Sequence, residues 1–147
     1  MKHLLFKTDE NSASFILRMT IGIIVLIHGI PKLGAGFTPF VQYITDYLQL
    51  PAILAYATIF IEIIGSVMLI IGFATRINAM FMLFLFIGMI LTVHGELGFM
   101  MNWFGTLEAG QEGYEYHVLV LAMCLSLMFL GGGRFSLDRW IYTKKKG

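Results

Sequence analysis

Four stretches of the chain are almost continuously apolar, and short polar segments separate them. They run over about residues 14–30, 52–72, 79–95 and 114–130. A helix that crosses the apolar layer of a bilayer needs about 20 such residues, so the first, third and fourth stretches are near the short limit. Backbone groups in lipid must bond to one another within a segment, so each stretch is predicted to be helical. The pattern predicts an all-α fold, an integral membrane four-helix bundle that runs up and down.

Two of the polar connections also contain apolar residues. Between residues 31 and 51, Phe40 and Ile44 belong to a stripe with helical spacing, which continues at Tyr47 or Leu48. This spacing predicts a short helix that lies on or dips into the outer membrane surface. The stretch 99–104, which contains a tryptophan, is typical of an interfacial anchor.

The composition supports a membrane location and excludes some functions. Of the 147 residues, 58% are hydrophobic and only 13% are charged, whereas about a quarter are charged in soluble proteins. A soluble domain of this size could not bury so much apolar surface. The few basic residues flank the apolar stretches, so nothing supports nucleic-acid binding. The single cysteine, Cys124, excludes an internal disulfide and a Cys-x-x-Cys redox pair.

The distribution of lysine and arginine predicts the orientation, because cytoplasmic loops are enriched in both. Lys32 is the one basic residue on the predicted outer side. The other side has Lys2, Lys7, Arg18, Arg76, Arg134, Arg139, Lys144, Lys145 and Lys146. We therefore expect the N-terminus and the C-terminus to be cytoplasmic. Arg18 lies about one turn inside the first stretch and is expected to extend to the cytoplasmic surface.

Three of the apolar stretches have two glycines seven residues apart, which is nearly two helical turns. Small residues on one face let helices approach closely in lipid. The spacing therefore predicts a tightly packed, left-handed bundle. The pairs are Gly22 and Gly29, Gly65 and Gly72, and Gly88 and Gly95.

Glu62 is the clearest polar exception within the apolar stretches. It lies about ten residues into the second stretch, about 15 Å deep at 1.5 Å per residue. A charge at that depth costs about 2.5–3.5 kcal/mol, so its presence suggests a function. Arg18 is predicted near the inner surface and Lys32 above the outer one, so neither is expected to pair with it. We expect Glu62 to be mostly neutral and to act as a catalytic proton carrier, or else to form an interhelical hydrogen bond.

A second group of polar residues is predicted at one level near the outer surface. His28 ends the first stretch, His94 ends the third, and Glu115 and His117 begin the fourth, with Lys32 just above. Glu115 and His117 are about 200° apart around a helix, so both cannot face inward. Neutral imidazoles can ligate a metal or haem, or hydrogen-bond a quinone head group. We take His94 as catalytic and the other four as ligand-binding; the alternative is that each histidine is an ordinary interfacial residue.

The sequence resembles the DoxX family of bacterial four-span membrane proteins over nearly its whole length. The similar features are His28-Gly29 followed by Lys32-Leu33, Glu62-Ile63-Ile64-Gly65, Gly72 to Arg76, Tyr114-Glu115, and Gly131 to Asp138. The resemblance implies one domain over residues 1–147 in the bacterial cytoplasmic (inner) membrane, crossing it several times. It also implies a link to quinone-coupled sulfur oxidation and oxidative-stress complexes, and therefore to a partner redox enzyme.

Two classes of function follow from the sequence. The first is a membrane redox component, a subunit or a quinone-binding or small-molecule-binding part of an oxidoreductase system. The second is a non-enzymatic membrane carrier, or a scaffold for a partner protein. Quinone reduction needs electrons and protons, and the sequence contains groups that handle protons but no recognisable electron carrier. This favours a subunit or a ligand binder over a complete enzyme.

Overall fold

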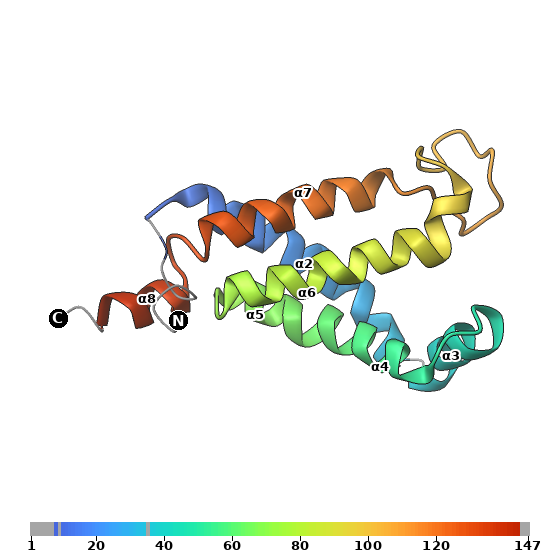
Figure 1. Cartoon of the computed structure of the whole chain (residues 1–147), viewed down its shortest axis with the longest axis horizontal. Helices are drawn as coiled ribbons and strands as arrows, with labels where there is room; N and C mark the ends of the chain where they lie inside the picture. Colours follow the sequence, from blue (N-terminus) through green and yellow to red (C-terminus); the bar gives the residue numbers. More distant parts are fainter. Residues whose placement is uncertain (1–7, 9, 35, 145–147) are drawn as a thin grey trace.

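The computed structural model describes residues 8, 10–34 and 36–144, and every regular element assigned among them is helical (Figure 1). This confirms the all-α prediction for the described part of the chain. Four of the basic residues used to predict orientation, Lys2, Lys7, Lys145 and Lys146, lie outside the described residues. The elements are α2 (Ser12–Gly34), α3 (Phe37–Gln42), η1 (Tyr43–Tyr47), α4 (Ala52–Phe60), η2 (Ile61–Gly65), α5 (Ser66–Ile71), α6 (Thr75–Met89), η3 (Ile90–His94), η4 (Gly95–Leu97), α7 (Glu115–Leu130) and α8 (Leu137–Lys144).

Three helical stretches are long and apolar enough to cross a membrane: Ser12–Gly34, Ala52–Ile71 and Thr75–Leu97. The second is made of α4, η2 and α5, and the third of α6, η3 and η4. The fourth apolar stretch forms α7, which has 16 residues and is shorter than those three. A fourth crossing therefore stays a prediction.

These helices lie lengthwise beside one another (Figure 1). Helix α6 packs against α7 and α5, and α2 packs against α5, η2 and α7. The start of α2 and α8 lie at one end, here called the inner end, and α3 and the loop after η4 lie at the other, the outer end. Ile21, Val25, Leu69, Met82, Phe86, Val120 and Leu127 belong to the buried core.

Glycine allows close helix packing at one interface. A Cβ at Gly22 would lie 2.7 Å from Ile70 Cγ1, and one at Gly29 would lie 2.7 Å from Ile63 Cδ1. Both are closer than real Cβ contacts allow, so these glycines permit α2 to lie against η2 and α5, as predicted. A Cβ at Gly88 would meet nothing within 4 Å, so this glycine is not needed for packing.

Arg18 does not extend to the surface, so that prediction was wrong. Its side chain is fully buried at the inner end. The last four carbonyls of a helix have no partner within that helix, and the five guanidinium N–H groups of an arginine can bond to several carbonyls at once. Arg18 donates hydrogen bonds to the backbone oxygens of Leu69, Ile70, Gly132, Arg134 and Phe135.

Asp138 lies at the same inner end and contacts the start of α6. Its carboxylate accepts hydrogen bonds from the backbone N–H groups of Ala74 (2.6 Å) and Thr75 (2.8 Å). Burial raises the pKa of Asp138, while these hydrogen bonds and the nearby Arg18 act in the opposite direction. At the inner end, Arg18 and Asp138 thus find hydrogen-bond partners within the chain.

Candidate functional site

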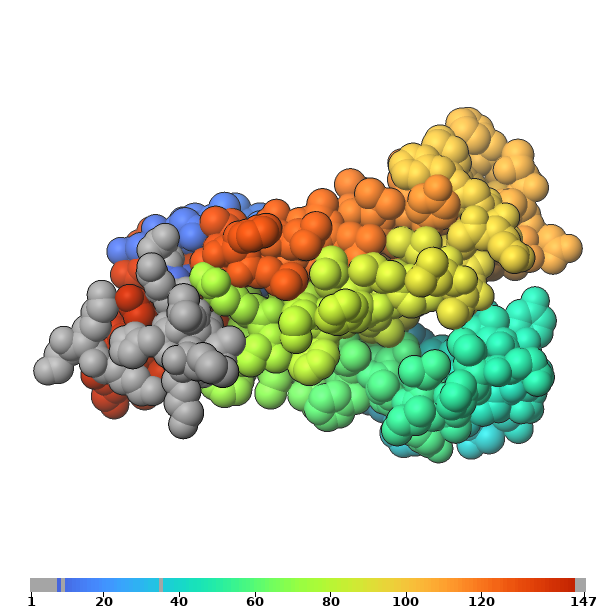
Figure 2. All heavy atoms as spheres, viewed as in Figure 1, coloured from blue at the N-terminus to red at the C-terminus, as the bar shows by residue number. Residues whose placement is uncertain are grey.

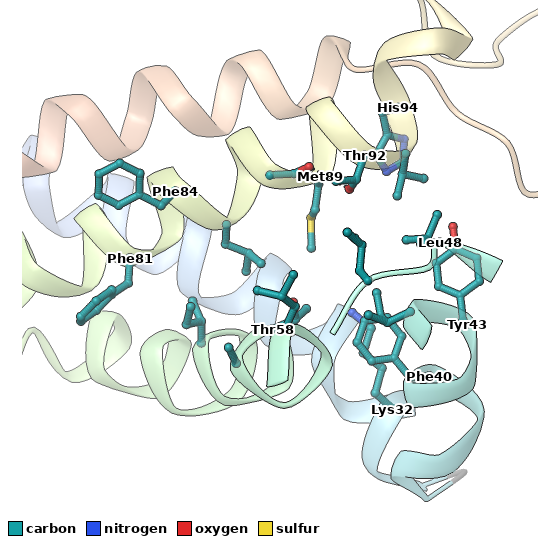
Figure 3. Close-up of a pocket in the computed structure, with 18 of the residues that line it drawn as sticks. Lys32, Phe40, Tyr43, Leu48, Thr58, Phe81, Phe84, Met89, Thr92 and His94 are labelled. Carbon is teal, nitrogen blue, oxygen red and sulfur yellow. Dashed lines mark hydrogen bonds between the residues drawn. The ribbon is translucent and has the colours of Figure 1, made fainter. Parts of the chain in front are cut away.

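The outer half of the molecule contains a pocket of about 520 Å³ (Figure 3). One wall comes from α4 and η2, the other from α6 and η3, and the segment α3–η1 covers the outer end. Figure 2 shows the surface hollowed between the yellow end of the third apolar stretch and the teal α3–η1 segment. Most of the lining is aliphatic or aromatic, and the polar side chains among it are Lys32, Tyr43, Thr58, Thr92 and His94.

The apolar part of the pocket reaches the perimeter of the helices. Leu54, Phe81 and Phe84 line the pocket, yet they remain 44%, 47% and 61% exposed. They lie on helices long and apolar enough to cross a membrane. The pocket can therefore receive a molecule from the side, where lipid chains would lie, and can present polar groups to it at the outer end.

Lys32 and Glu62 form an ion pair beside this pocket. Lys32 Nζ lies 2.6 Å from Glu62 Oε1 and 2.5 Å from Oε2. Glu62 is 2% exposed, and the Lys32 side chain 21%. The expectation that Lys32 would lie too far out to pair with Glu62 was therefore wrong, and the Glu62 carboxyl group is not isolated.

Two features of α2 explain this pairing. The helix continues to Gly34 with Pro31 inside it, so Lys32 belongs to the helix and not to the loop above it. Side chains on a helix lean toward its N-terminus, so the Lys32 arm points back into the molecule. One turn earlier, a Cβ at Gly29 would lie 3.0 Å from Glu62 Cβ; the missing side chain brings the two helices within reach.

Aromatic residues of the α3–η1 segment cover the ion pair. Lys32 Nζ lies 4.6 Å from the centre of the Phe40 ring, a distance at which a cation is attracted to the ring face. Tyr43 lines the same part of the pocket, and burial, followed by the effect of Tyr47, raises the pKa of its hydroxyl. Tyr43 therefore presents a neutral hydroxyl group. The apolar stripe of this segment is visible in the sequence, whereas its position over a pocket is not.

His94 lies at the opposite wall of the pocket (Figure 3). Its Nδ1 is 2.7 Å from the backbone oxygen of Glu112. His117 is buried behind it, with the two ring centres 4.1 Å apart. These two of the predicted site histidines therefore lie together, and one of them faces the pocket.

His28 and Glu115 do not line the pocket. The exposed His28 ring stacks with Tyr116 at 6.3 Å, and its Nδ1 bonds the carbonyl of Ile24. Glu115 accepts hydrogen bonds from the Met101 backbone and from Trp103 Nε1 in the outer loop. As predicted, only one of Glu115 and His117 faces the interior. The ligand-binding roles of His28 and Glu115 stay predictions without a pocket contact.

Both residues predicted to be catalytic lie in π-helical segments. Glu62 belongs to η2, and His94 is the last residue of η3. Single π-helical turns inside α-helices are rare and often occur at functional sites, because the extra residue re-aims neighbouring side chains. The two segments face the same pocket from opposite walls through Ile61 and His94.

The described part of the chain contains no group of three or more His, Cys, Asp or Glu side chains arranged to hold a metal ion. His94 and His117 are a pair without a third such residue. Haem, which needs fewer protein ligands, stays a prediction from sequence.

Comparison with known proteins identifies the family. A model of the DoxX family matches residues 13–95, more than half of the chain. The chain belongs to the DoxX family. This DoxX protein is also 32% identical over 134 residues to a protein of Bacillus subtilis (strain 168) named "Putative oxidoreductase CatD", and the alignment covers 90% of each chain. No solved structure matches it significantly. The family and the three long apolar helices together make it a membrane protein.

Proposed function

We propose that this DoxX protein spans the bacterial inner membrane four times and binds a quinone in its outer pocket, as a component of an oxidoreductase system. The observation that carries the proposal is the pocket itself: an apolar cleft of about 520 Å³, with Lys32, Tyr43 and His94 at its outer end. Such a cleft with a few polar groups is typical of small-molecule sites. A quinone fits it because its ring carries polar oxygens and its tail is apolar.

The relative supports a redox role. It is named an oxidoreductase, and its alignment with this chain includes most of both proteins. The family match includes all of the pocket lining except Gly110. We propose that electrons come from a partner redox enzyme, in line with the sequence interpretation.

The residues of the site would have complementary roles in ligand binding. The Lys32 ammonium group has three N–H donors, and its two contacts to Glu62 leave donor capacity for a ligand oxygen. Glu62 holds Lys32 in place and can accept a proton from it. His94 offers a second polar contact across the pocket, and His117 supports its ring.

The charge distribution supports the proposed orientation. Among the described residues, the inner end has five basic side chains: Arg18, Arg76, Arg134, Arg139 and Lys144. The outer end has Lys32, together with the acidic Asp46, Glu96, Glu108, Glu112 and Glu115. By the positive-inside rule, this distribution supports a cytoplasmic location for the inner end, with the start of α2 and α8.

Gly88 allows a direct test. It lines the pocket, and a Cβ there would meet nothing within 4 Å, so Gly88→Phe should fill the cleft and preserve the fold. We expect the affinity for a decyl-substituted benzoquinone, measured on purified protein by thermophoresis, to fall at least about tenfold, or 1.4 kcal/mol. Ala122→Phe adds the same ring at an exposed position of α7 and should change the affinity by less than about twofold. Equal affinities of both variants would contradict the proposal.

A measurement of quinone reduction distinguishes a redox component from a carrier or scaffold. If the protein is a redox component, the purified complex with its partner should reduce the bound quinone, and Gly88→Phe should abolish this. Binding without any quinone reduction in membranes would instead favour the carrier or scaffold function.

A further inference from the structure

The hydrogen bond of His94 determines which of its ring nitrogens carries the proton. A backbone carbonyl can only accept, so the Nδ1 that lies 2.7 Å from the Glu112 oxygen must donate. In the neutral ring the other nitrogen, Nε2, is then without a proton and is a hydrogen-bond acceptor. No hydrogen bond to Nε2 is formed within the described part of the chain. The wall of the pocket at His94 therefore presents an acceptor.

His117 maintains this arrangement from behind. Its ring is 6% exposed and lies 4.1 Å from that of His94, centre to centre, at an angle of 43°. Phe86 packs against His117 at 5.4 Å. His117 Nδ1 is buried and has no hydrogen-bond partner among the described residues. His117 therefore acts on His94 by ring contact, as a positioning residue.

The opposite side of the pocket presents a donor. Lys32 lines the pocket, and its ammonium group can donate a further hydrogen bond besides those to Glu62. A ring hydroxyl can form hydrogen bonds with either side of the pocket, because it can donate to His94 and accept from Lys32. A quinone oxygen can only accept, and it would meet the lone pair of Nε2 without a hydrogen bond. Leaving a polar group of the site unpaired is how a pocket rejects a close analogue.

We propose that the pocket prefers the reduced, hydroxyl-bearing form of its ligand, a quinol or long-chain phenol, to the quinone. This rests on the proposed function and names the form of the ligand that the neutral site recognises. It assigns His94 Nε2 as the group that determines specificity and the Glu112 carbonyl as the group that determines its tautomer.

A pair of redox-inert probes tests this, 4-dodecylphenol and its methyl ether, which differ by one hydrogen-bond donor. Affinities are measured on purified protein at pH 8, where histidine is ordinarily neutral. We expect the phenol to bind at least about fivefold more tightly than the ether. His94→Phe keeps a ring but removes the acceptor, and should reduce the ratio to about one. Ala122→Phe, which adds the same ring at an exposed position of α7 outside the pocket, should leave the ratio unchanged.

Variants of His117 test its positioning role. His117→Phe keeps the ring contact and should preserve the preference for the phenol, whereas His117→Ala should weaken it. Equal binding of the two probes to the unmodified protein, or tighter binding of the ether, would overturn the inference and leave the pocket proposal intact. If neither probe bound, and Gly88→Phe did not change quinone binding either, the proposed function would fail as well.

Discussion

Two basic residues of helix α2, Arg18 and Lys32, are both drawn into the protein but meet very different surroundings. Arg18 is fully buried at the inner end and donates to five backbone carbonyls. Lys32, fourteen residues later, binds one carboxylate beside a pocket, and its side chain is 21% exposed. The guanidinium group has its donors occupied by the fold itself, whereas the ammonium group has a titratable partner and open space beside it.

This difference predicts different roles for the two residues, although both belong to α2. Neutral carbonyls at helix ends are fixed by the backbone, so the inner cluster has one arrangement. The Lys32–Glu62 pair lies beside open space, and a ligand can compete for Lys32. We therefore expect changes at Arg18 to affect folding and changes at Lys32 and Glu62 to affect ligand binding more than folding.

The largest effect should come from Arg18→Met. It removes the Arg18 donor from five backbone carbonyls, of which the Leu69 oxygen keeps the Gly72 N–H. Hydrogen bonds to charged groups contribute about 1.5–3 kcal/mol each, although not additively. We expect a loss of about 3 kcal/mol or more and a lower midpoint of thermal unfolding for the purified protein. Arg18→Lys should restore part of the stability, because lysine keeps the charge without the planar fork. An unchanged midpoint in Arg18→Met would show that these hydrogen bonds do not hold the inner end together.

Breaking the outer pair should have a smaller effect on stability. Lys32→Met leaves the Glu62 carboxylate buried and unpaired, which should cost about 1–3 kcal/mol. The double variant Lys32→Met/Glu62→Leu should recover much of this, because apolar replacements of a buried ion pair are often neutral. Both variants should bind quinone poorly. Recovery of quinone binding together with stability would mean that the pair acts only as an interhelical contact.

Single cysteine substitutions, which should have the smallest effect, test on which side of the membrane each end of the molecule lies. Cysteines replace Asn102 in the outer loop and Lys144 at the end of α8, each in a Cys124→Ser background, and should preserve the packing of the long apolar helices because both positions lie outside them. A membrane-impermeant maleimide should label Asn102→Cys in intact cells and Lys144→Cys only after lysis. Labelling of both from outside would contradict the four-span orientation and the names given to the two ends.

The helical elements could be predicted from the sequence because their signal is local. The apolar stretch predicted at 52–72 coincides with α4, η2 and α5, and the stripe around Phe40 and Ile44 forms α3 and η1. The first stretch was predicted too short: polar residues after Ile30 indicated a loop, although the helix continues to Gly34. That difference of one turn is the reason why the Lys32–Glu62 pair was missed.

The site could be predicted only in part, because its geometry depends on contacts between segments far apart in the chain. The residues themselves were visible as polar exceptions, and the structure brings His94 and His117 together, and Lys32 and Glu62. The pocket depends on the separation of α4 and α6, and no residue pattern within either helix encodes that. The environment of Arg18 depends on carbonyls more than fifty residues away in sequence.

Photoaffinity labelling would locate a quinone bound in the outer pocket. A long-chain quinone with a diazirine on its ring would be crosslinked in native membranes, and the labelled peptides identified by mass spectrometry. The proposed quinone site predicts labels at Tyr43, Met89 or His94, which line the pocket, and their loss in Gly88→Phe but not in Ala122→Phe. Labels confined to α7 or α8, or labelling that Gly88→Phe leaves unchanged, would contradict it.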